Sequence, residues 1–358
     1  MIRRLVVLMI AVLALSCESS SYEEGAPKST ASTRYTGLEI GPTPVGVIPD
    51  VLLRDNDRNK DIDLVIDYPT RGGPHPLIVF SPGFGGSHRG YVGLSSYWAA
   101  NNYVVIRVNH RDRIANITKA EEVWVNATAA DWKNRARDIT LVLDSLESLV
   151  QRYPELEGKI DATKIGVAGH AYGSHTAMLA GGVRTFPGGV SYADPRVKAV
   201  IAMSPQGPAE SRGLTSESFA ELRVPAMFMT GTLDQGATES ETPEWRSEGF
   251  KLAPAGDKWL VTIEGVRTAT FTGRNDGLLE AIAREEDRDI GRTYVPSRRP
   301  ETSPRTRTEQ ASVRHQQMVA DIRGIALTFF DTYVRGDAAG REALEKAGTR
   351  TGVVVEKK

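Results

Sequence analysis

A tight turn near the middle of the chain has the form that presents a nucleophile, yet it lacks one. Residues 169–173 read Gly-His-Ala-Tyr-Gly, after the strand-like run 164–169 and before a run of small residues. Between a strand and a helix, flanking glycines tolerate the crowded backbone and lift the central side chain above the sheet. A serine there would attack a carbonyl carbon, whereas the methyl group of Ala171 cannot. The turn therefore predicts the framework of an acyl-transfer site without its nucleophile.

A carboxylate follows a later strand, where the acid of such a site is expected. The apolar run 224–230 leads into Gly231-Thr232-Leu233-Asp234. Asp234 is our candidate for the acid, whose ordinary role is to orient a histidine and balance its charge. The alternative is an aspartate that only caps a turn. The base should follow the last strand, 259–263, which leads into residues 266–271.

The histidines and the serine near the elbow do not form an evident substitute pair. Helix-surface or core positions are expected for three of these residues, His170, Ser174 and His175, and loop positions for two others, His75 and His110. His88 follows the strand 76–80 and is expected nearer the pocket, while His315 should begin the final helix. No His/Asp/Glu cluster has the spacing of metal ligands, so we expect neither a metal nor another cofactor.

The elements that must position these groups alternate between short strands and helical periods. Buried strands are expected at 76–80, 103–108, 164–169, 197–203, 224–230 and 259–263. Residues 45–53 and 62–68 should form an antiparallel hairpin at one edge. A helix from Asp131 and a final helix that buries Met318 to Tyr333 carry apolar residues three and four apart. This order predicts an α/β fold with a mainly parallel sheet of about eight strands and helices on both faces.

Composition and charge favour one globular domain. The chain has 358 residues, 40% of them hydrophobic, and a formal net charge of −1. Such a chain creates no field that would concentrate nucleic acid, so we expect no nucleic-acid partner. We place a single domain at 35–358, with an exposed loop near 287–309 where Arg, Pro, Thr and Ser are frequent.

The N-terminal segment predicts export. Two arginines precede the apolar run 5–15, which has signal-peptide length and is too short to span a bilayer. Ser16 and the only cysteine, Cys17, follow directly and resemble the lipobox of bacterial lipoproteins; the alternative is a plain secretory signal with an incidental cysteine. We therefore assign 1–17 to the signal segment and the polar residues 18–34 to a flexible tether.

In these features the chain resembles the dienelactone-hydrolase-like and platelet-activating-factor-acetylhydrolase-like esterases, which are similar to bacterial polyester hydrolases. Those relatives have an α/β-hydrolase fold and read approximately G-x-x-H-x-x-F after the last strand. Here Gly265 and Phe271 keep the frame, and Thr268 occupies the histidine position. The resemblance also implies an oxyanion hole from the backbone N–H groups of Phe84 and Tyr172, although Pro82 replaces the relatives' histidine in that loop.

Two of three triad members are thus absent, and Asp234 would lose its histidine partner. If Asp234 is buried, its pKa should rise unless a donor or a cation replaces the imidazole, and Thr268 or Arg267 could do so. The pocket rim should include Trp245, for which simple packing is the alternative to ligand contact.

The function predicted from the sequence is a secreted or lipid-anchored α/β-hydrolase-fold protein of the carboxylic-ester hydrolase lineage that is catalytically inactive. The alternatives are an active ester hydrolase that uses unidentified residues and a deliberately inactivated variant of a serine esterase. The expected ligand is a small ester, an acid or a polyester-like molecule. Membrane contact is expected only through a lipid anchor at Cys17, on a bacterial membrane, in the periplasm or outside the cell.

Overall fold

A computed structural model describes residues 35–38, 41–84, 88, 90–110, 129–236, 238–273 and 304–358. The side chains of 129–131 and 304–312 are not described, although both segments belong to helices. The predicted signal segment 1–17 and tether 18–34 lie outside the described residues.

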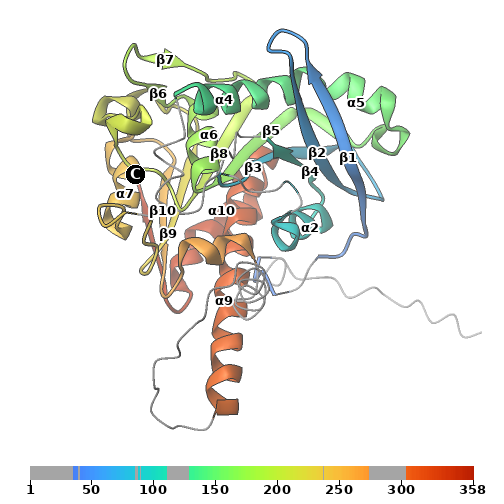
Figure 1. The fold of residues 1–358 in the computed structure, drawn as a ribbon. Coiled ribbons are helices and arrows are strands. Elements are labelled where there is room, and N and C mark those ends of the chain that lie inside the picture. The colour runs from blue at the N-terminus through green and yellow to red at the C-terminus, as the bar shows by residue number, and fades with distance from the viewer. Residues whose placement is uncertain are drawn as a thin grey trace, which may run out of the picture.

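The described residues form a nine-stranded, mainly parallel sheet (Figure 1). In spatial order the strands are β1 (Val45–Asp55), β2 (Lys60–Pro69), β4 (Val104–Asn109), β3 (His75–Ser81), β5 (Ile160–His170), β8 (Val197–Met203), β9 (Ala226–Gly231), β10 (Lys258–Ile263) and β11 (Val353–Lys357). β2 and β11 run antiparallel to their neighbours, and the other neighbouring pairs are parallel. A separate hairpin joins β6 (Arg184–Thr185) to β7 (Val190–Ser191).

Helices cover both faces of the sheet (Figure 1). One face carries α4 (Ala129–Asp144), α5 (Leu146–Arg152), α6 (Tyr172–Gly181) and α7 (Pro243–Leu252), and the other carries α2 (Val92–Ala100), α9 (Pro304–Phe330) and α10 (Ala338–Glu345). Short helical turns are η1 (Pro154–Leu156), η2 (Glu210–Arg212), η3 (Ser216–Glu221), η4 (Thr268–Thr272), the π-helical η5 (Asp331–Arg335) and η6 (Ala347–Thr349). No helix among the described residues is long and apolar enough to cross a membrane.

The central strands are buried on both faces, which explains their continuous apolar sequences. In β3, Val79 belongs to the core under α4 and α6, whereas Phe80 belongs to the core under α2 and α9. Parallel strands of this kind end at one edge of the sheet, so the residues that follow β3, β5, β8 and β9 meet there.

The predicted fold class and the edge hairpin are confirmed, and three details of the prediction are corrected. The strand at 259–263 is not the last one, because β11 pairs with its outer edge. The helix predicted from Asp131 is interrupted at Ser145 and continues as α5. Of the predicted loop 287–309, residues 287–303 lie outside the described residues, and the remainder is already helical because α9 begins at Pro304.

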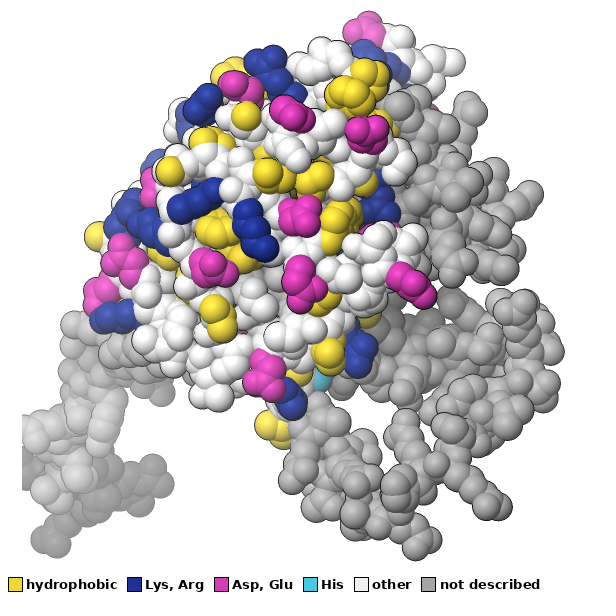
Figure 2. All heavy atoms as spheres, turned by 90° about the vertical axis from the view of Figure 1, so that its left-hand side faces the viewer, with side chains coloured by type: hydrophobic (Ala, Val, Ile, Leu, Met, Phe, Trp, Pro, Cys, Tyr) yellow, Lys and Arg dark blue, Asp and Glu magenta, His cyan; other side chains and the backbone are white. Residues whose placement is uncertain are grey.

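The surface seen in Figure 2 carries interspersed basic, acidic and apolar side chains. This pattern fits the formal net charge of −1.

Candidate functional site

The turn between β5 and α6 keeps the shape of a nucleophile elbow although its central residue is alanine. Ala171 has φ 51° and ψ −113°, a conformation that costs an L-residue on the order of 1–3 kcal/mol. A Cβ on Gly169 would lie 1.9 Å from the carbonyl oxygen of Gly173, and a Cβ on Gly173 would lie 2.0 Å from that of Ser81. Only glycine therefore fits on either side of Ala171. Ser174 follows in α6 and donates its hydroxyl to the Ala171 carbonyl at 2.6 Å.

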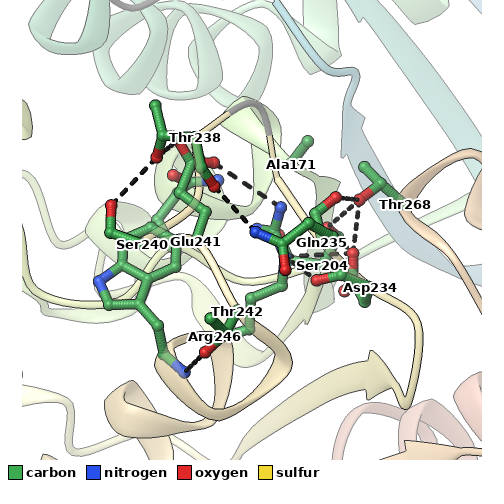
Figure 3. Close-up of polar contacts among 12 residues, drawn as sticks. Ala171, Ser204, Asp234, Gln235, Thr238, Ser240, Glu241, Thr242, Arg246 and Thr268 are labelled. Carbon is green, nitrogen blue, oxygen red and sulfur yellow. Dashed lines mark hydrogen bonds and ion pairs between the residues drawn. The ribbon is translucent and has the colours of Figure 1, made fainter.

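Asp234 is fully buried just after β9, and donors surround its carboxylate (Figure 3). Oδ1 accepts hydrogen bonds from Thr268 Oγ1 at 2.5 Å and from Ser204 Oγ at 2.8 Å. Oδ2 accepts one from Thr230 Oγ1 at 3.0 Å. Arg246 Nε lies 3.1 Å from Oδ1. The carboxylate therefore has three hydroxyl donors and one cation without any histidine.

The cation beside Asp234 comes from α7 and not from the residue next to Thr268. Arg246 is 2% exposed, and its guanidinium also donates to the carbonyl oxygens of Asp234, Ser204 and Pro205. Arg267, which we expected as one substitute for the imidazole, is exposed. Both kinds of replacement that the sequence analysis named, a donor and a cation, are therefore present.

His170 connects three loops around the elbow. Its Nε2 lies 2.9 Å from the carbonyl oxygen of Thr268, so Nε2 carries the proton and donates. Nδ1 then accepts from the Tyr91 hydroxyl at 2.7 Å, and that hydroxyl accepts from the N–H of Gly83 at 3.3 Å. Burial and the charge of Arg246 lower the pKa of His170 to about 3. The imidazole is neutral, and both of its nitrogens are engaged away from Ala171.

The loop after β3 is held against the first residue of α6. The rings of Phe84 and Tyr172 meet edge to face, with centroids 5.4 Å apart. Arg135, from α4, lies 4.6 Å above the Tyr172 ring and donates to the carbonyl oxygens of Pro82 and Gly83. The two residues whose N–H groups were predicted to form the oxyanion hole therefore lie in contact; the hole itself stays a prediction.

On the α7 side, Trp245 packs among arginines. Its Nε1 donates to Pro208 O at 2.9 Å, and Arg212 lies 5.1 Å above its ring. Arg212 in turn donates to Gln206 at 2.5 Å and forms an ion pair with the buried Glu241. These contacts favour the packing interpretation of Trp245 over a contact with ligand.

A complete Ser–His–Asp arrangement, which sequence analysis missed, lies beneath the elbow. His110 lies in the loop directly after β4, as expected, and it is buried. Its Nδ1 lies 2.8 Å from Asp138 Oδ2, and Ser81 Oγ lies 2.9 Å from its Nε2. Asp138 also pairs with Lys60 Nζ at 2.8 Å and with Arg58 Nη1 at 2.7 Å. We call Ser81, His110 and Asp138 the Ser81 array.

Three further histidines, His75, His88 and His315, lie among the described residues. His75 begins β3 instead of lying in a loop, and its Nε2 contacts the Arg71 carbonyl at 3.0 Å. His315 lies within α9 instead of at its start, because the helix begins at Pro304. His88 is buried, and its carbonyl oxygen accepts from a buried arginine of β4. Among the described residues, no group of three His, Cys, Asp or Glu side chains could hold a metal ion.

A cavity of about 700 Å³ lies elsewhere, between residues 35–38, α9 and α10. None of its described lining residues belongs to the elbow or to the surroundings of Asp234. The chemistry that the sequence predicts is therefore separate from this cavity.

Comparison with protein families agrees with the predicted resemblance. Residues 66–148 match the model of the family described as platelet-activating factor acetylhydrolase, isoform II, which lies in the α/β-hydrolase superfamily. The matched segment runs from β2 through α4 and contains the Ser81 array, but it ends before the elbow. The match points to an esterase or lipase lineage. The chain is therefore an α/β-hydrolase-fold protein, and its residues 66–148 are similar to the platelet-activating factor acetylhydrolase isoform II family.

Proposed function

We propose that this chain is a non-catalytic member of the ester-hydrolase lineage that holds a small carboxylic ester, an acid or a polyester-like ligand near the elbow. The observation that carries the proposal is the set of donors on Asp234. A lost histidine would leave an uncompensated carboxylate, and a buried charge without partners is strongly unfavourable. Here Thr268, Ser204 and Arg246 supply that compensation at distances of 2.5, 2.8 and 3.1 Å.

The geometry of Ser204 supports the same proposal. This residue has φ 48°, a left-handed conformation that non-glycine residues rarely adopt. Its backbone N–H donates to the Met229 carbonyl at 2.8 Å, and its hydroxyl lies on Asp234. The site is thus organised around a histidine-free carboxylate.

Chemistry at Ala171 and Thr268 does not permit a serine-hydrolase cycle. A methyl group cannot form an acyl-enzyme, and a threonine hydroxyl cannot accept a proton near neutral pH. Without nucleophile and base, an oxyanion hole and binding alone leave roughly 10³–10⁴-fold acceleration over water. Turnover at that level serves no ester-hydrolase function.

We also propose that the protein is exported and held at a membrane through a lipid on Cys17. The charged start, the apolar run and the single cysteine support this proposal. Metabolic labelling with a fatty acid should mark the parent chain and not a Cys17→Ala variant. Equal labelling of both would contradict the anchor.

The Ser81 array favours a second candidate, an active hydrolase that uses other residues. Its distances meet the geometric criterion for an activated serine. We rank it second because the side chains of His110 and Asp138 are 0% exposed and Ser81 is buried to the same degree. Asp138 also pairs with Lys60 and Arg58, as expected for a structural role of the array.

The deciding experiment offers p-nitrophenyl acetate and p-nitrophenyl butyrate to the mature protein, with heat-unfolded protein as the control. We expect no release of nitrophenol above that control. In parallel, calorimetry with hexanoate and with methyl hexanoate measures binding. Clear turnover that disappears in Ser81→Ala would establish the second candidate, and the absence of any binding would contradict the first.

A further inference from the structure

The first turns of α4 and α6 meet beside the elbow and form an aromatic corner. Trp132 and Arg135 belong to α4, and Tyr172 and His175 belong to α6. The His175 ring lies 5.1 Å from the Trp132 ring and 6.2 Å from the Tyr172 ring. Because helix side chains lean toward the N-terminus, His175 covers the turn of α6 that begins at the elbow. We call these residues, together with Arg212, the α4–α6 corner.

His175 contains a buried polar atom that the fold does not use. The residue is 1% exposed, and no residue that the structure describes hydrogen-bonds to its Nε2. Buried polar groups are nearly always paired, since an unpaired one loses its hydrogen bonds to water without replacement. This atom is therefore a candidate for a contact with something other than the described chain.

The electrostatics of the corner select an anion. Helices α4 and α6 both begin at this edge, and helix N-termini favour negative charge. The charges of Arg212 and Arg135 add to the effect of burial, which is the main cause that lowers the pKa of His175 to about 3. The imidazole is neutral and can donate from Nε2, while the surrounding positive potential disfavours a cationic ligand.

We propose that the α4–α6 corner is a head-group site beside the elbow and that it binds the carboxylate of a free carboxylic acid, with His175 Nε2 as a donor. The aromatic rings of Trp132 and Tyr172 suit the apolar carbon chain next to that carboxylate. The inference rests on the proposed function, because it names the class of ligand that is held near the elbow. It predicts preference for an acid over the corresponding ester.

The test compares sodium hexanoate with methyl hexanoate by calorimetry, using the mature parent protein and two variants. His175→Phe keeps the ring volume and removes the donor, and His175→Gln keeps an N–H donor. We expect hexanoate to bind about ten-fold more weakly to the Phe variant, since a hydrogen bond to a charged group is worth that much or more. The Gln variant should stay within about three-fold of the parent, and methyl hexanoate should bind all three alike.

A spectroscopic measurement keeps the test valid if His175→Phe does not fold. In parent protein with ¹⁵N-labelled histidine, hexanoate should shift the Nε2 signal of one neutral imidazole, and methyl hexanoate should not. His75→Phe is the matched control, because His75 lies at the opposite end of β3 and bonds to Arg71. It should leave both affinities unchanged.

Each contrary result has a distinct meaning. If the parent binds acid and ester equally, the head-group site is wrong and the proposed function stands. If acid binds preferentially but His175→Phe binds it as the parent does, His175 is structural and the inference is wrong. If neither molecule binds the parent, the proposed function fails together with the inference.

Discussion

The elbow and the Ser81 array are adjacent regions with opposite deficits. The elbow has a strained turn, a buried aspartate and a loop in the position of a base, but Ala171 and Thr268 lack the reactive groups. The array has a serine, a histidine and an aspartate at 2.9 and 2.8 Å, but it lies under α4 and α6. Reactive groups and an accessible position are separate requirements, and in this chain each region meets one of them.

The two buried aspartates show how the regions differ in purpose. Asp234 is satisfied by hydroxyls from three segments and by Arg246, all at the edge where parallel strands end. Asp138 instead joins His110 to Lys60 and Arg58 and so ties α4 to the turn between β1 and β2. We interpret Asp234 as a carboxylate whose expected histidine partner is replaced by other donors. We interpret Asp138 as a structural clamp.

The largest effect should follow when the elbow regains its reactive groups. In Ala171→Ser/Thr268→His, hydrolysis of p-nitrophenyl acetate should rise by about 10²–10⁴-fold over the parent, less than the roughly 10⁶ that a whole triad provides. The gain should be partial because Arg246 and Ser204 already occupy Asp234 Oδ1. Initial rates measure it.

Ala171→Ser alone is the matched control for the double variant. It restores the nucleophile without a base, so its rate should remain near that of the parent. A double variant that folds, as judged by circular dichroism, but stays inert would show that Thr268 is not the base position.

The general fold was readable from the sequence, because apolar runs mark buried parallel strands and Gly-x-x-x-Gly marks the elbow. Helices that are apolar on all sides and very short strands could not be predicted from the sequence. In α2 the buried residues cover most of the helix, so no amphipathic period appears, and β11 has only five residues. Both depend on tertiary packing for their stability.

The partners within the site were less predictable, since they are distant in sequence. The sequence left Thr268 and Arg267 open as partners of Asp234; Thr268 reaches the carboxylate, whereas Arg267 is not the cation. The fold instead delivers Arg246 through α7. His110 and Asp138 likewise meet only because β4 and α4 pack side by side, and neither spacing nor residue type signals that contact.

Removing the aspartate of the Ser81 array should produce the largest loss of stability. Asp138→Ala would leave Arg58, 9% exposed, and Lys60, 21% exposed, without their shared carboxylate. Breaking a buried ion pair costs about 3–5 kcal/mol of unfolding free energy. Urea denaturation measures it, with Asp144→Ala as the control.

Asp144 is 59% exposed and pairs with Arg196, so its loss should cost less than about 1 kcal/mol. Equal losses would refute the clamp.

Acid should destabilise the elbow through its neutral histidines. Burial and the charge of Arg246 lower the pKa of His170 from its ordinary value of 6.5 to about 3 in the folded protein. Between these values the unfolded chain binds a proton that the folded chain excludes, so stability falls as the pH falls. The slope is about 1.4 kcal/mol per pH unit, or roughly 2 kcal/mol between pH 8 and pH 5 for this residue. Urea denaturation at pH 8 and at pH 5 measures the unfolding free energy at each pH. In His170→Gln, the difference between the two values should be smaller by this contribution of roughly 2 kcal/mol. An unchanged difference would mean that His170 is protonated in the fold.

Ser81→Ala should have the smallest effect and separates the two regions most directly. The change removes the hydroxyl that His110 Nε2 accepts from, at 2.9 Å, and so removes one buried hydrogen bond, for a loss of about 1 kcal/mol in urea denaturation. Its effect on ester hydrolysis should be nil, both in the parent and in the Ala171→Ser/Thr268→His background, because the array orients no substrate.

A fall in rate in the parent background would show that the buried serine reacts. A fall only in the restored background would show that Ser81 positions the elbow, since its carbonyl oxygen closely approaches Gly173. Unchanged rates with a measurable loss of stability would establish that the Ser–His–Asp geometry here serves folding alone.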